Sequence, residues 1–299
     1  MLDVRRLHLL RELSHLGTIA AVAEAHSYTA SAVSQQLAAL QREAGVPLLE
    51  RTGRGVSLTA AGAALVAHAE DALSALEAAD ATLAAARSGL AGPLGVGAFP
   101  SAVRTLLPAA LVSLGRAHPS LVLRVTELDP VEVPAALRTR QVDVALVHDY
   151  DLVPAAPDTT EESVPVLDER VHLAVPAGWS EDDADPIRAC AQAAWIVGSP
   201  GTLCHTLAVR ACLAAGYAPR VRHYADDFTA VLALVAAGQG VALVPRLAVE
   251  HLPSGVRLVE LPIHRRTRIA YRRGSGAHPA IAACVAALRV SAAQVCPPG

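Results

Sequence analysis

The chain has 299 residues, of which 53% are hydrophobic and 18% charged, and its formal net charge is -3, so it is neither a disordered chain nor a strongly basic one. The length leaves room for two domains. All 25 basic residues are Arg. Residues 1–62 hold only six of them against five acidic residues, so any binding of nucleic acid must depend on where the positive charges lie rather than on how many there are.

Three closely spaced helices are predicted at the N-terminus. Leucines recur at helical spacing over residues 7–16, and Gly17 ends that run. A short helix over 18–25 follows, and after a turn of three residues a third helix begins at Thr29 or Ser31. Two helices joined by so short a turn form a helix-turn-helix.

The third helix carries a polar face that suits the major groove of DNA. Ser34, Gln35 and Gln36 face outward when the apolar residues of this helix are buried. Gln can pair with the edge of adenine, and Ser with several bases. A small helical bundle without DNA contacts has the same spacing, so the helices alone leave both interpretations open.

A small hairpin is predicted next, over 50–58. Its tip carries Arg51 and Arg54, and such a wing can reach phosphates or the minor groove. The candidate DNA-binding residues are Thr18, Thr29, Ser31, Ser34, Gln35, Gln36, Arg51 and Arg54.

Five short motifs follow one another in the first 62 residues. They are an opening Leu-x-x-Leu pattern, GTIAAVA at 17–23, SAVSQQL at 31–37, GVPLLER at 45–51 and TAAG at 59–62. Together they resemble the winged helix-turn-helix of LysR-type transcriptional regulators. The resemblance implies a regulator of double-stranded promoter or operator DNA, with RNA polymerase as a partner if it activates. Members often carry Pro in place of Ser31 and Arg in place of Gln35, so the base preference does not carry over.

One long Ala-rich helix is predicted from Thr59 to about Ser88. Leu76, Leu83 and Leu90 repeat every seven residues, which is the spacing of a seam between two helices. A helix packed on its own domain has the same stripe, but the acidic residues of this segment surround the stripe rather than interrupt it. In the resembled family this segment is the linker helix that pairs two subunits, which implies a dimer or a tetramer.

Strands and helices alternate through the rest of the chain, which indicates parallel sheets covered by helices. The motifs LLP at 106–108, VDVAL at 142–146 and AAGQGVALVP at 236–245 resemble the effector-binding domain of the same family. The fold class is therefore an all-α winged helix-turn-helix with a long linker helix, followed by a bilobal α/β periplasmic-binding-protein-like (type II) domain. The expected divisions are a DNA-binding domain (1–58), a dimerising linker helix (59–90) and an effector-binding domain (91–299), with lobe I at 91–163 and 267–299 and lobe II at 164–266.

An effector pocket is expected at the carboxyl ends of strands, beside helix N-termini. Ser101 and Thr202 stand at such places, although each is equally explained as a helix N-cap. His148 and Asp149 follow a buried strand near the expected hinge, where they contact either a polar or partly cationic effector or only the hinge. Acidic residues 226 and 227 are most simply explained as favourable charges at a helix N-terminus. The candidate effector-binding residues are Pro100, Ser101, His148, Asp149, Thr202 and Phe228.

No motif indicates catalysis, a metal or a cofactor. A Gly-rich phosphate loop, a nucleophile elbow and a His-Glu-x-x-His run are absent, so we expect no enzyme. Cys204 and Cys212 lie eight residues apart on one predicted helix, about 12 Å at a rise of 1.5 Å per residue, which is too far for a disulfide. We therefore do not expect redox sensing.

Two features bear on the location of the protein. The N-terminus interleaves charges with leucines and lacks the apolar core of a signal peptide. This pattern also argues against an exported solute-binding protein. The uncharged run over 228–245 has the length of a membrane helix, but two glycines interrupt it and Pro245 ends it. We expect a soluble, cytoplasmic protein that contacts no membrane.

Overall fold

The computed structural model describes residues 1–53, 55–87, 89–154, 158–179 and 185–295. The chain forms two compact units. The first comprises Met1–Arg87 with the segment Arg272–His278, and the second comprises Ser88–Tyr271 with the segment from Pro279. The sequence predicts a division after residue 90, but it gives no sign that a distant C-terminal segment joins the first unit.

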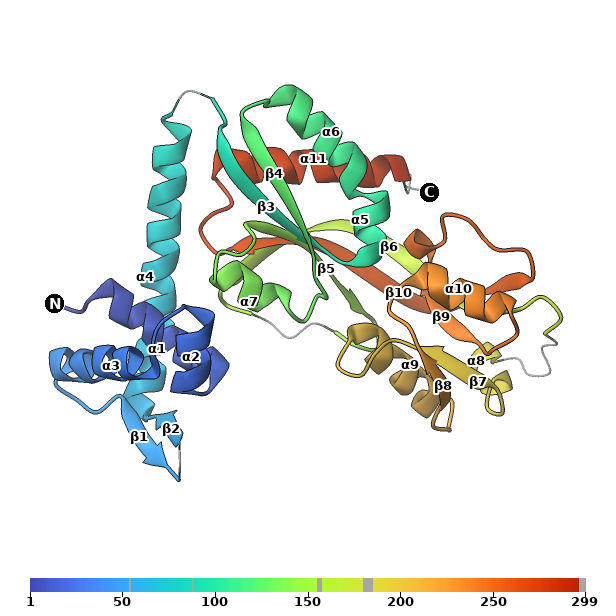
Figure 1. Cartoon of the computed structure of the whole chain (residues 1–299), viewed down its shortest axis with the longest axis horizontal. Helices are drawn as coiled ribbons and strands as arrows, with labels where there is room; N and C mark the ends of the chain where they lie inside the picture. The colour runs from blue at the N-terminus through green and yellow to red at the C-terminus, as the bar shows by residue number, and fades with distance from the viewer. Residues whose placement is uncertain (54, 88, 155–157, 180–184, 296–299) are drawn as a thin grey trace. The chain divides into compact units, whose positions relative to one another are not determined.

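Helices α1, α2 and α3 begin the first unit, with bounds Val4–Leu16, Ile19–Ala25 and Ala30–Ala44 (Figure 1). Asp3, Thr18 and Thr29 are their N-caps, and each side chain accepts hydrogen bonds from backbone N–H groups of the first turn. Of the two starts considered for the third helix, Thr29 is therefore the cap. Gly17 and Gly45 end α1 and α3 with positive φ, a conformation that costs glycine little.

The three helices bury one apolar core, to which Leu10, Val22, Val33 and Leu40 contribute. The hairpin follows as β1 (Leu49–Thr52) and β2 (Gly55–Leu58), which pair antiparallel. The side-chain oxygen of Gln41 accepts hydrogen bonds from the backbone N–H groups of Leu48 and Leu49, each at 3.0 Å. This contact fixes where the hairpin leaves α3.

The long helix α4 spans Ala60–Ala85 and ends slightly before the predicted residue. Thr59 caps it, and Gly62 lies so close to the hairpin that an added Cβ would stand 2.2 Å from the carbonyl oxygen of Leu48. The segment Arg272–His278 also contacts α4, through ion pairs from Arg272 to Glu77 at 3.3 Å and from Arg273 to Asp71 at 3.1 Å. These acidic residues therefore hold a C-terminal segment of the same chain.

The second unit consists of two lobes. Lobe I contains β3 (Gly92–Ala98), α5 (Pro100–Thr105), α6 (Leu107–Ala117), β4 (Leu121–Glu127), α7 (Val133–Arg138), β5 (Val144–Tyr150) and α11 (Pro279–Val295). Lobe II contains α8 (Pro186–Ala189), β7 (Ala194–Val197), α9 (Leu203–Ala214), β8 (Arg220–Tyr224), α10 (Phe228–Ala236) and β9 (Ala242–Pro245). Helices α5 and α6 follow each other directly but are separate, because Pro108 has no backbone N–H to continue the helical ladder.

Two long strands, β6 (Glu161–Pro176) and β10 (Val256–Arg272), run through both lobes (Figure 1). They give one sheet the order β4-β3-β5-β10-β6-β9, while β7 and β8 form a second, parallel pair. Strand β3 is parallel to β4 and β5, but β10 is antiparallel to β5 and β6 is antiparallel to β9. The expectation of purely parallel sheets is therefore wrong, and the expected lobe boundaries fall inside these two strands.

Each lobe has its own apolar core. In lobe I, α6 and α11 pack on the sheet around Val96, Leu146 and Ile269, which are fully buried. In lobe II, the fully buried Trp195 and Cys212 lie between β7 and α9. Because two separate cores are joined by two strands, the crevice between the lobes has walls from distant parts of the chain. Over the described ranges, no helix is long and apolar enough to cross a membrane.

Candidate functional site

The outer face of α3 is polar and exposed. Ser34, Gln35 and Gln36 are all exposed, as are the cap residue Thr29 and the neighbouring Ser31. The side-chain oxygen of Gln36 accepts a hydrogen bond from Nε of the α1 arginine at position 6, at 2.9 Å. One side chain of this face is thus held by the preceding helix, while Gln35 has no such restraint among the interactions of the described residues.

The remaining candidate DNA-binding residues lie at the edges of this face. Thr18 is exposed and caps α2, and Arg51 is exposed on β1. Arg54 lies outside the described residues. Sequence reasoning missed Tyr28, an aromatic side chain 56% exposed that directly precedes the cap of α3. A large exposed aromatic beside a helix N-terminus is the signal that could have drawn attention to it.

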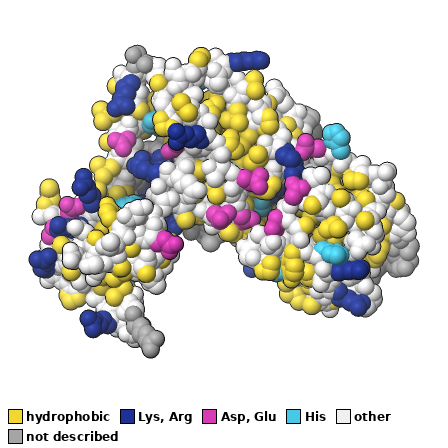
Figure 2. Space-filling view, viewed as in Figure 1, with side chains coloured by type: hydrophobic (Ala, Val, Ile, Leu, Met, Phe, Trp, Pro, Cys, Tyr) yellow, Lys and Arg dark blue, Asp and Glu magenta, His cyan; other side chains and the backbone are white. Residues whose placement is uncertain are grey.

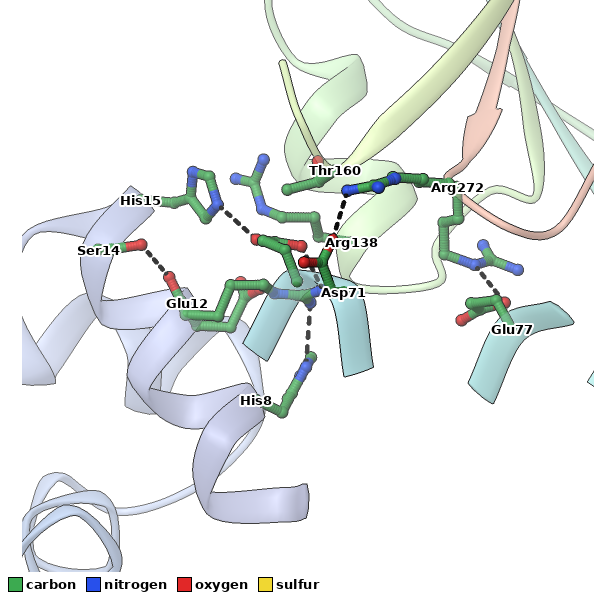
Figure 3. Close-up of polar contacts among 12 residues, drawn as sticks. His8, Glu12, Ser14, His15, Asp71, Glu77, Arg138, Thr160 and Arg272 are labelled. Carbon is green, nitrogen blue, oxygen red and sulfur yellow. Dashed lines mark hydrogen bonds and ion pairs between the residues drawn. The ribbon is translucent and has the colours of Figure 1, made fainter. Parts of the chain in front are cut away.

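A buried charged cluster joins α1 to α4 (Figure 3). Glu12 is 1% exposed and accepts hydrogen bonds from Nε and Nη2 of Arg11 at 3.0 and 2.8 Å. Arg11 also lies 3.7 Å from Glu70 of α4, and His26 lies 3.3 Å from Glu12. The ligand atoms of His8, Glu12 and His26 lie within 4.8 Å of one another, as in a metal site. The guanidinium of Arg11, which also contacts Nδ1 of His8 at 3.0 Å, already supplies positive charge there.

A cavity of about 260 Å³ lies between the two lobes of the second unit. Its lining comes from the residues after β3, from the end of β4 and the residues after it, from β5, from the starts of α9 and α10, and from β10. Five of the six predicted effector-binding residues are in this lining, namely Pro100, Ser101, His148, Thr202 and Phe228. The structure therefore brings these five side chains together, from both lobes, around one cavity.

Asp149 is the predicted residue that does not line the cavity. It follows His148 on β5, and successive side chains of a strand point to opposite faces. Its carboxylate lies 3.3 Å from Nη2 of Arg268 and 3.9 Å from Nη1 of Arg266, both on β10. Of the two roles considered for Asp149, this geometry favours a contact between the strands that link the lobes.

Arg265, which lines the cavity, belongs to a buried ion pair. Arg265 is fully buried, and its Nε and Nη2 lie 2.8 and 2.7 Å from a carboxylate oxygen of Glu169. Its guanidinium also stands 5.0 Å from the ring centre of Phe99, and Nη1 lies 3.4 Å from Oγ of Ser101. The charge of this arginine is therefore balanced inside the protein. Nothing in the sequence distinguishes it from the arginines around it.

His148 stands beside this pair with an unsatisfied ring nitrogen. It is 4% exposed, and its ring packs edge-on against Phe99 at 4.7 Å and Tyr150 at 5.1 Å. Its Nδ1 has no hydrogen-bond partner among the described residues. Burial, with the nearby charge of Arg265, holds the pKa of His148 well below its ordinary value, so the ring is neutral at pH 7. A neutral imidazole can accept or donate a hydrogen bond here.

Four carboxylates also line the cavity, and sequence reasoning selected none of them. Glu127 ends β4 in lobe I, Asp129 and Glu132 follow that strand, and Asp226 precedes α10 in lobe II. The expectation that both acids before α10 act at its N-terminus holds for residue 227, which caps the helix, whereas Asp226 faces the cavity. Glu127, Asp129 and Glu132 stand at or just after the carboxyl end of a strand, and this position could have identified them as candidate ligand-binding residues from the sequence.

Cys204 is the sulfur-containing residue of the lining. Its Sγ lies 3.4 Å from Oη of Tyr150, and burial raises the pKa of the thiol, so the thiol stays protonated at neutral pH. Cys212, on the same helix, is buried in the core of lobe II, and burial raises its pKa to about 11. Neither thiol is in a disulfide.

A winged helix-turn-helix combined with a two-lobe domain around a cavity defines a DNA-binding regulator with a ligand-binding domain. Two family models match the chain in these same parts. The model described as "Bacterial regulatory helix-turn-helix protein, lysR family" matches residues 4–63, and that described as "LysR substrate binding domain" matches residues 87–293. The chain belongs to the LysR family of transcriptional regulators, and the predicted fold class is confirmed.

Individual relatives agree with this assignment. A "Probable hydrogen peroxide-inducible genes activator" of Mycobacterium xenopi is 36% identical over 177 residues, which cover 58% of this chain and 88% of that protein. A mutant of OxyR from Corynebacterium glutamicum has a similar structure, with a TM-score of 0.58, 25% identity, and coverage of 99% and 94% of the two chains. Full-length CbnR in complex with its target DNA shares the fold, with a TM-score of 0.53, 23% identity, and coverage of 97% and 99%.

Proposed function

We propose that this protein binds operator DNA as a homo-oligomer and that a small molecule in the cavity between its lobes controls that binding. The observation that carries the proposal is the cavity itself, which is lined by residues of both lobes and of one of the strands that join them. A ligand there contacts both lobes at once and therefore favours one arrangement of the lobes over others. The action is in the cytoplasm, where bacterial DNA is found, and involves no catalysis.

The DNA contacts divide into two kinds. The exposed face of α3, with Ser34, Gln35 and Gln36, reads base edges in the major groove. Arg51 and Arg54 bind the phosphate backbone from the hairpin, and Thr18, Thr29 and Ser31 lie on the phosphates beside the groove. Since the first 62 residues carry almost no net charge, specificity rests more on these contacts than on general attraction to DNA.

Self-association occurs through α4. Leu76 and Leu83 are 47% and 61% exposed, although both are large and apolar, and they lie two turns apart on the same side of the helix. Exposed leucines at this spacing favour a second copy of the helix as their partner. Two DNA-binding units then meet two half-sites of one operator, and RNA polymerase is a further partner if the protein activates transcription.

Two measurements on the full chain test the proposal. Selection of duplexes from a random library should enrich an inverted repeat, and a library that stays unenriched would contradict the DNA-binding part. A screen of small metabolites by thermal unfolding should then find a stabilising compound, since a ligand at 100 times its Kd adds about 2.7 kcal/mol to the free energy of unfolding. That compound must also change the affinity for the selected operator, or the cavity does not control DNA binding.

Oxidant sensing is a second candidate, because several relatives are named as hydrogen peroxide-inducible activators and Cys204 lines the cavity. The raised pKa of the Cys204 thiol argues against it, since the thiolate is the reactive form. We expect hydrogen peroxide to leave operator affinity unchanged in the wild-type protein. A change in the wild-type protein that Cys204→Ser abolishes would establish this second function instead.

A further inference from the structure

The cavity between the lobes is surrounded by uncompensated negative charge. Four carboxylates line it, those of Glu127, Asp129, Glu132 and Asp226, and acidic side chains gather on one face of the second unit (Figure 2). Arg265 is the one arginine of the lining, and its charge is balanced by Glu169. In the part of the chain that the structure describes, no ion pair joins any of the four carboxylates to an arginine.

The partners of these carboxylates are neutral groups. Asp129 accepts a hydrogen bond from the backbone N–H of Val131 at 3.0 Å, and Glu132 accepts one from the backbone N–H of Asp129 at 2.9 Å. Asp226 accepts hydrogen bonds from the N–H and the hydroxyl of Ser199, at 2.7 and 2.6 Å. These bonds fix the orientation of the carboxylates and leave their charge in place.

Two of the helix N-termini at the same cavity are capped by side chains. The first turn of α9 is capped by the hydroxyl of Thr202, which accepts from the N–H of His205 at 3.2 Å. The first turn of α10 is capped by Asp227, whose carboxylate accepts from the N–H groups of Thr229 and Ala230. Side chains of the chain itself therefore occupy N–H groups at the starts of α9 and α10, whereas α5, whose first residues Pro100 and Ser101 also line the cavity, has no side-chain cap.

A second and independent feature points to a ligand. His148 is almost completely buried, lines the cavity, and has an Nδ1 without a hydrogen-bond partner among the described residues. Unpaired buried polar atoms are costly unless a ligand or water satisfies them. Beside it, Phe99 and Phe228 give the cavity apolar walls, suited to a short hydrocarbon stem.

We propose that the effector is a small organic amine, bound as its ammonium ion between the carboxylates of the two lobes, with its apolar stem against Phe99 and Phe228 and a polar group of the ligand toward His148. This inference rests on the proposed role of the cavity as the effector site. It predicts that a neutral analogue or an acid of the same size binds more weakly than the amine.

The same charges explain how an amine acts on the lobes. Asp129 belongs to lobe I and Asp226 to lobe II, and burial together with the charges of Glu132 and Asp226 raises the pKa of Asp129. An ammonium ion between the lobes removes this repulsion and favours their closed arrangement. Another cation already joins the two lobes in this way. Arg104 of lobe I forms ion pairs with two carboxylates of lobe II, those of Asp227 and Glu250, and the pair with Glu250 is 3.1 Å long.

The test compares ligands of one size and different charge on the full-length protein. Butylamine, 1,4-diaminobutane and 2-phenylethylamine are set against butanol, butyrate and phenylacetate, at constant ionic strength and with tetramethylammonium as a control for nonspecific cations. We expect saturable increases in Tm with the amines only. Stabilisation by the acids alone, or by no compound of the panel, overturns the inference.

Variants then locate the site. Glu127→Gln and Asp226→Asn should each weaken amine binding about tenfold or more, the effect of losing one charge-assisted hydrogen bond. Glu260→Gln, which changes an exposed carboxylate of the same unit, should leave binding unchanged. Glu127 is exposed and has no ion-pair or hydrogen-bond partner for its side chain among the described residues. This variant therefore decides the test if Asp226→Asn fails to fold. Equal affinity of Glu127→Gln, Glu260→Gln and wild-type protein would overturn the assignment.

Failure of the inference and failure of the proposed function give different results. Operator affinity is measured by fluorescence anisotropy with each compound of the panel. If an acid both stabilises the protein and changes operator affinity, the cavity is still an effector site but the amine inference is wrong. If amines bind but operator affinity never changes, the inference about the ligand holds and the regulatory function of the cavity fails.

Discussion

Arg265 and Glu169 are the charged residues most deeply buried beside the cavity, with side chains 0% and 1% exposed. Glu169 also accepts a hydrogen bond from the backbone N–H of Leu247, so it links β6, β10 and the turn after β9. Taking two ions out of water is costly, and the pair is tolerated because the opposite charges attract each other at 2.7 Å, although Nη2 of Arg265 makes no hydrogen bond to a described residue. The pair holds Arg265 in place in the cavity lining and balances its charge with a buried carboxylate.

Glu169→Gln should destabilise the protein by about 3–5 kcal/mol, because it leaves the buried guanidinium of Arg265 without a counter-charge. Urea unfolding of the second unit measures this loss. Glu260→Gln is the matched control, since Glu260 is 64% exposed and its pair with Arg170 is 3.8 Å long, so its loss should cost less than about 1 kcal/mol. Equal effects of the two substitutions would contradict the special role of the buried pair.

His148 should make the second unit sensitive to acid. Its pKa is lowered in the folded state by burial and by Arg265, so below about pH 6.5 the unfolded chain binds a proton that the folded chain does not. The contribution of His148 is therefore fully present above that pH and is lost as pH falls. His148→Gln should reduce the slope of the unfolding free energy between about pH 6.5 and 5, measured in urea against the wild-type protein. An unchanged slope would mean that the ring is protonated in the folded state.

Gln35 and Arg51 should affect DNA binding differently. Gln35→Ala should relax the preference at one base pair per half-site, where a side chain that pairs with a base edge contributes about 1–3 kcal/mol of discrimination. Arg51→Ala should weaken binding to all sequences alike and reduce the salt dependence of affinity, as expected for a phosphate contact. Binding-site selection followed by anisotropy titrations at several salt concentrations separates the two effects. A Gln35→Ala variant with an unchanged sequence profile would mean that another part of α3 reads the bases.

At the scale of elements, α4 combines two contacts on different faces. One face packs on α1, where Glu70 forms an ion pair with Arg11. The helix also contacts the C-terminal segment Arg272–His278, through the ion pair between Glu77 and Arg272. Gly274 lies so close to α4 that an added Cβ would stand 2.3 Å from the carbonyl oxygen of Ser74. The face with Leu76 and Leu83 has no partner of comparable size within the described residues of the chain, so it is free for a second copy.

Leu83→Asp should weaken self-association at least tenfold, because it puts a charge into an apolar seam between two helices. Sedimentation at several protein concentrations measures the effect. Thr82→Asp adds the same charge one residue away, outside the stripe, and should leave the oligomeric state unchanged. If both variants dissociate equally, general repulsion rather than this seam explains the result.

At the scale of the whole molecule, the two lobes of the second unit are joined by two continuous strands and by ion pairs. The strands β6 and β10 lie side by side in the sheet. Arg104 crosses from α5 to Asp227 and Glu250 of lobe II, with side chains 30%, 44% and 43% exposed. Pairs of this exposure contribute little to folding, but they bias the balance between open and closed lobes.

Arg104→Ala should therefore open the lobes without unfolding them. We expect amide hydrogen exchange to rise several-fold in the first turn of α10 and over residues 246–250, with little change in the core of either lobe. Arg116→Ala, which changes an exposed arginine of α6, is the control. Unchanged exchange in Arg104→Ala would mean that the two strands alone set the position of the lobes.

The sequence by itself determined the local elements and the family. Helices α1 to α3, their caps and the long α4 follow from leucine spacing, Thr or Asp caps and glycine ends, which act within a few residues. Five of six candidate effector residues also came to line one cavity, because the carboxyl ends of strands meet at one edge of a sheet.

Tertiary structure decided what depends on contacts between distant residues. Nothing local shows that Arg265 pairs with Glu169, that Asp149 turns to Arg268 rather than to the cavity, or that Arg272 meets Glu77. The polar first half of β6 also depends on such contacts, since it forms a strand by pairing within the sheet rather than by an apolar pattern of its own. The charge of the cavity depends on such pairings too, because a carboxylate attracts a cation only when the fold leaves it without an arginine.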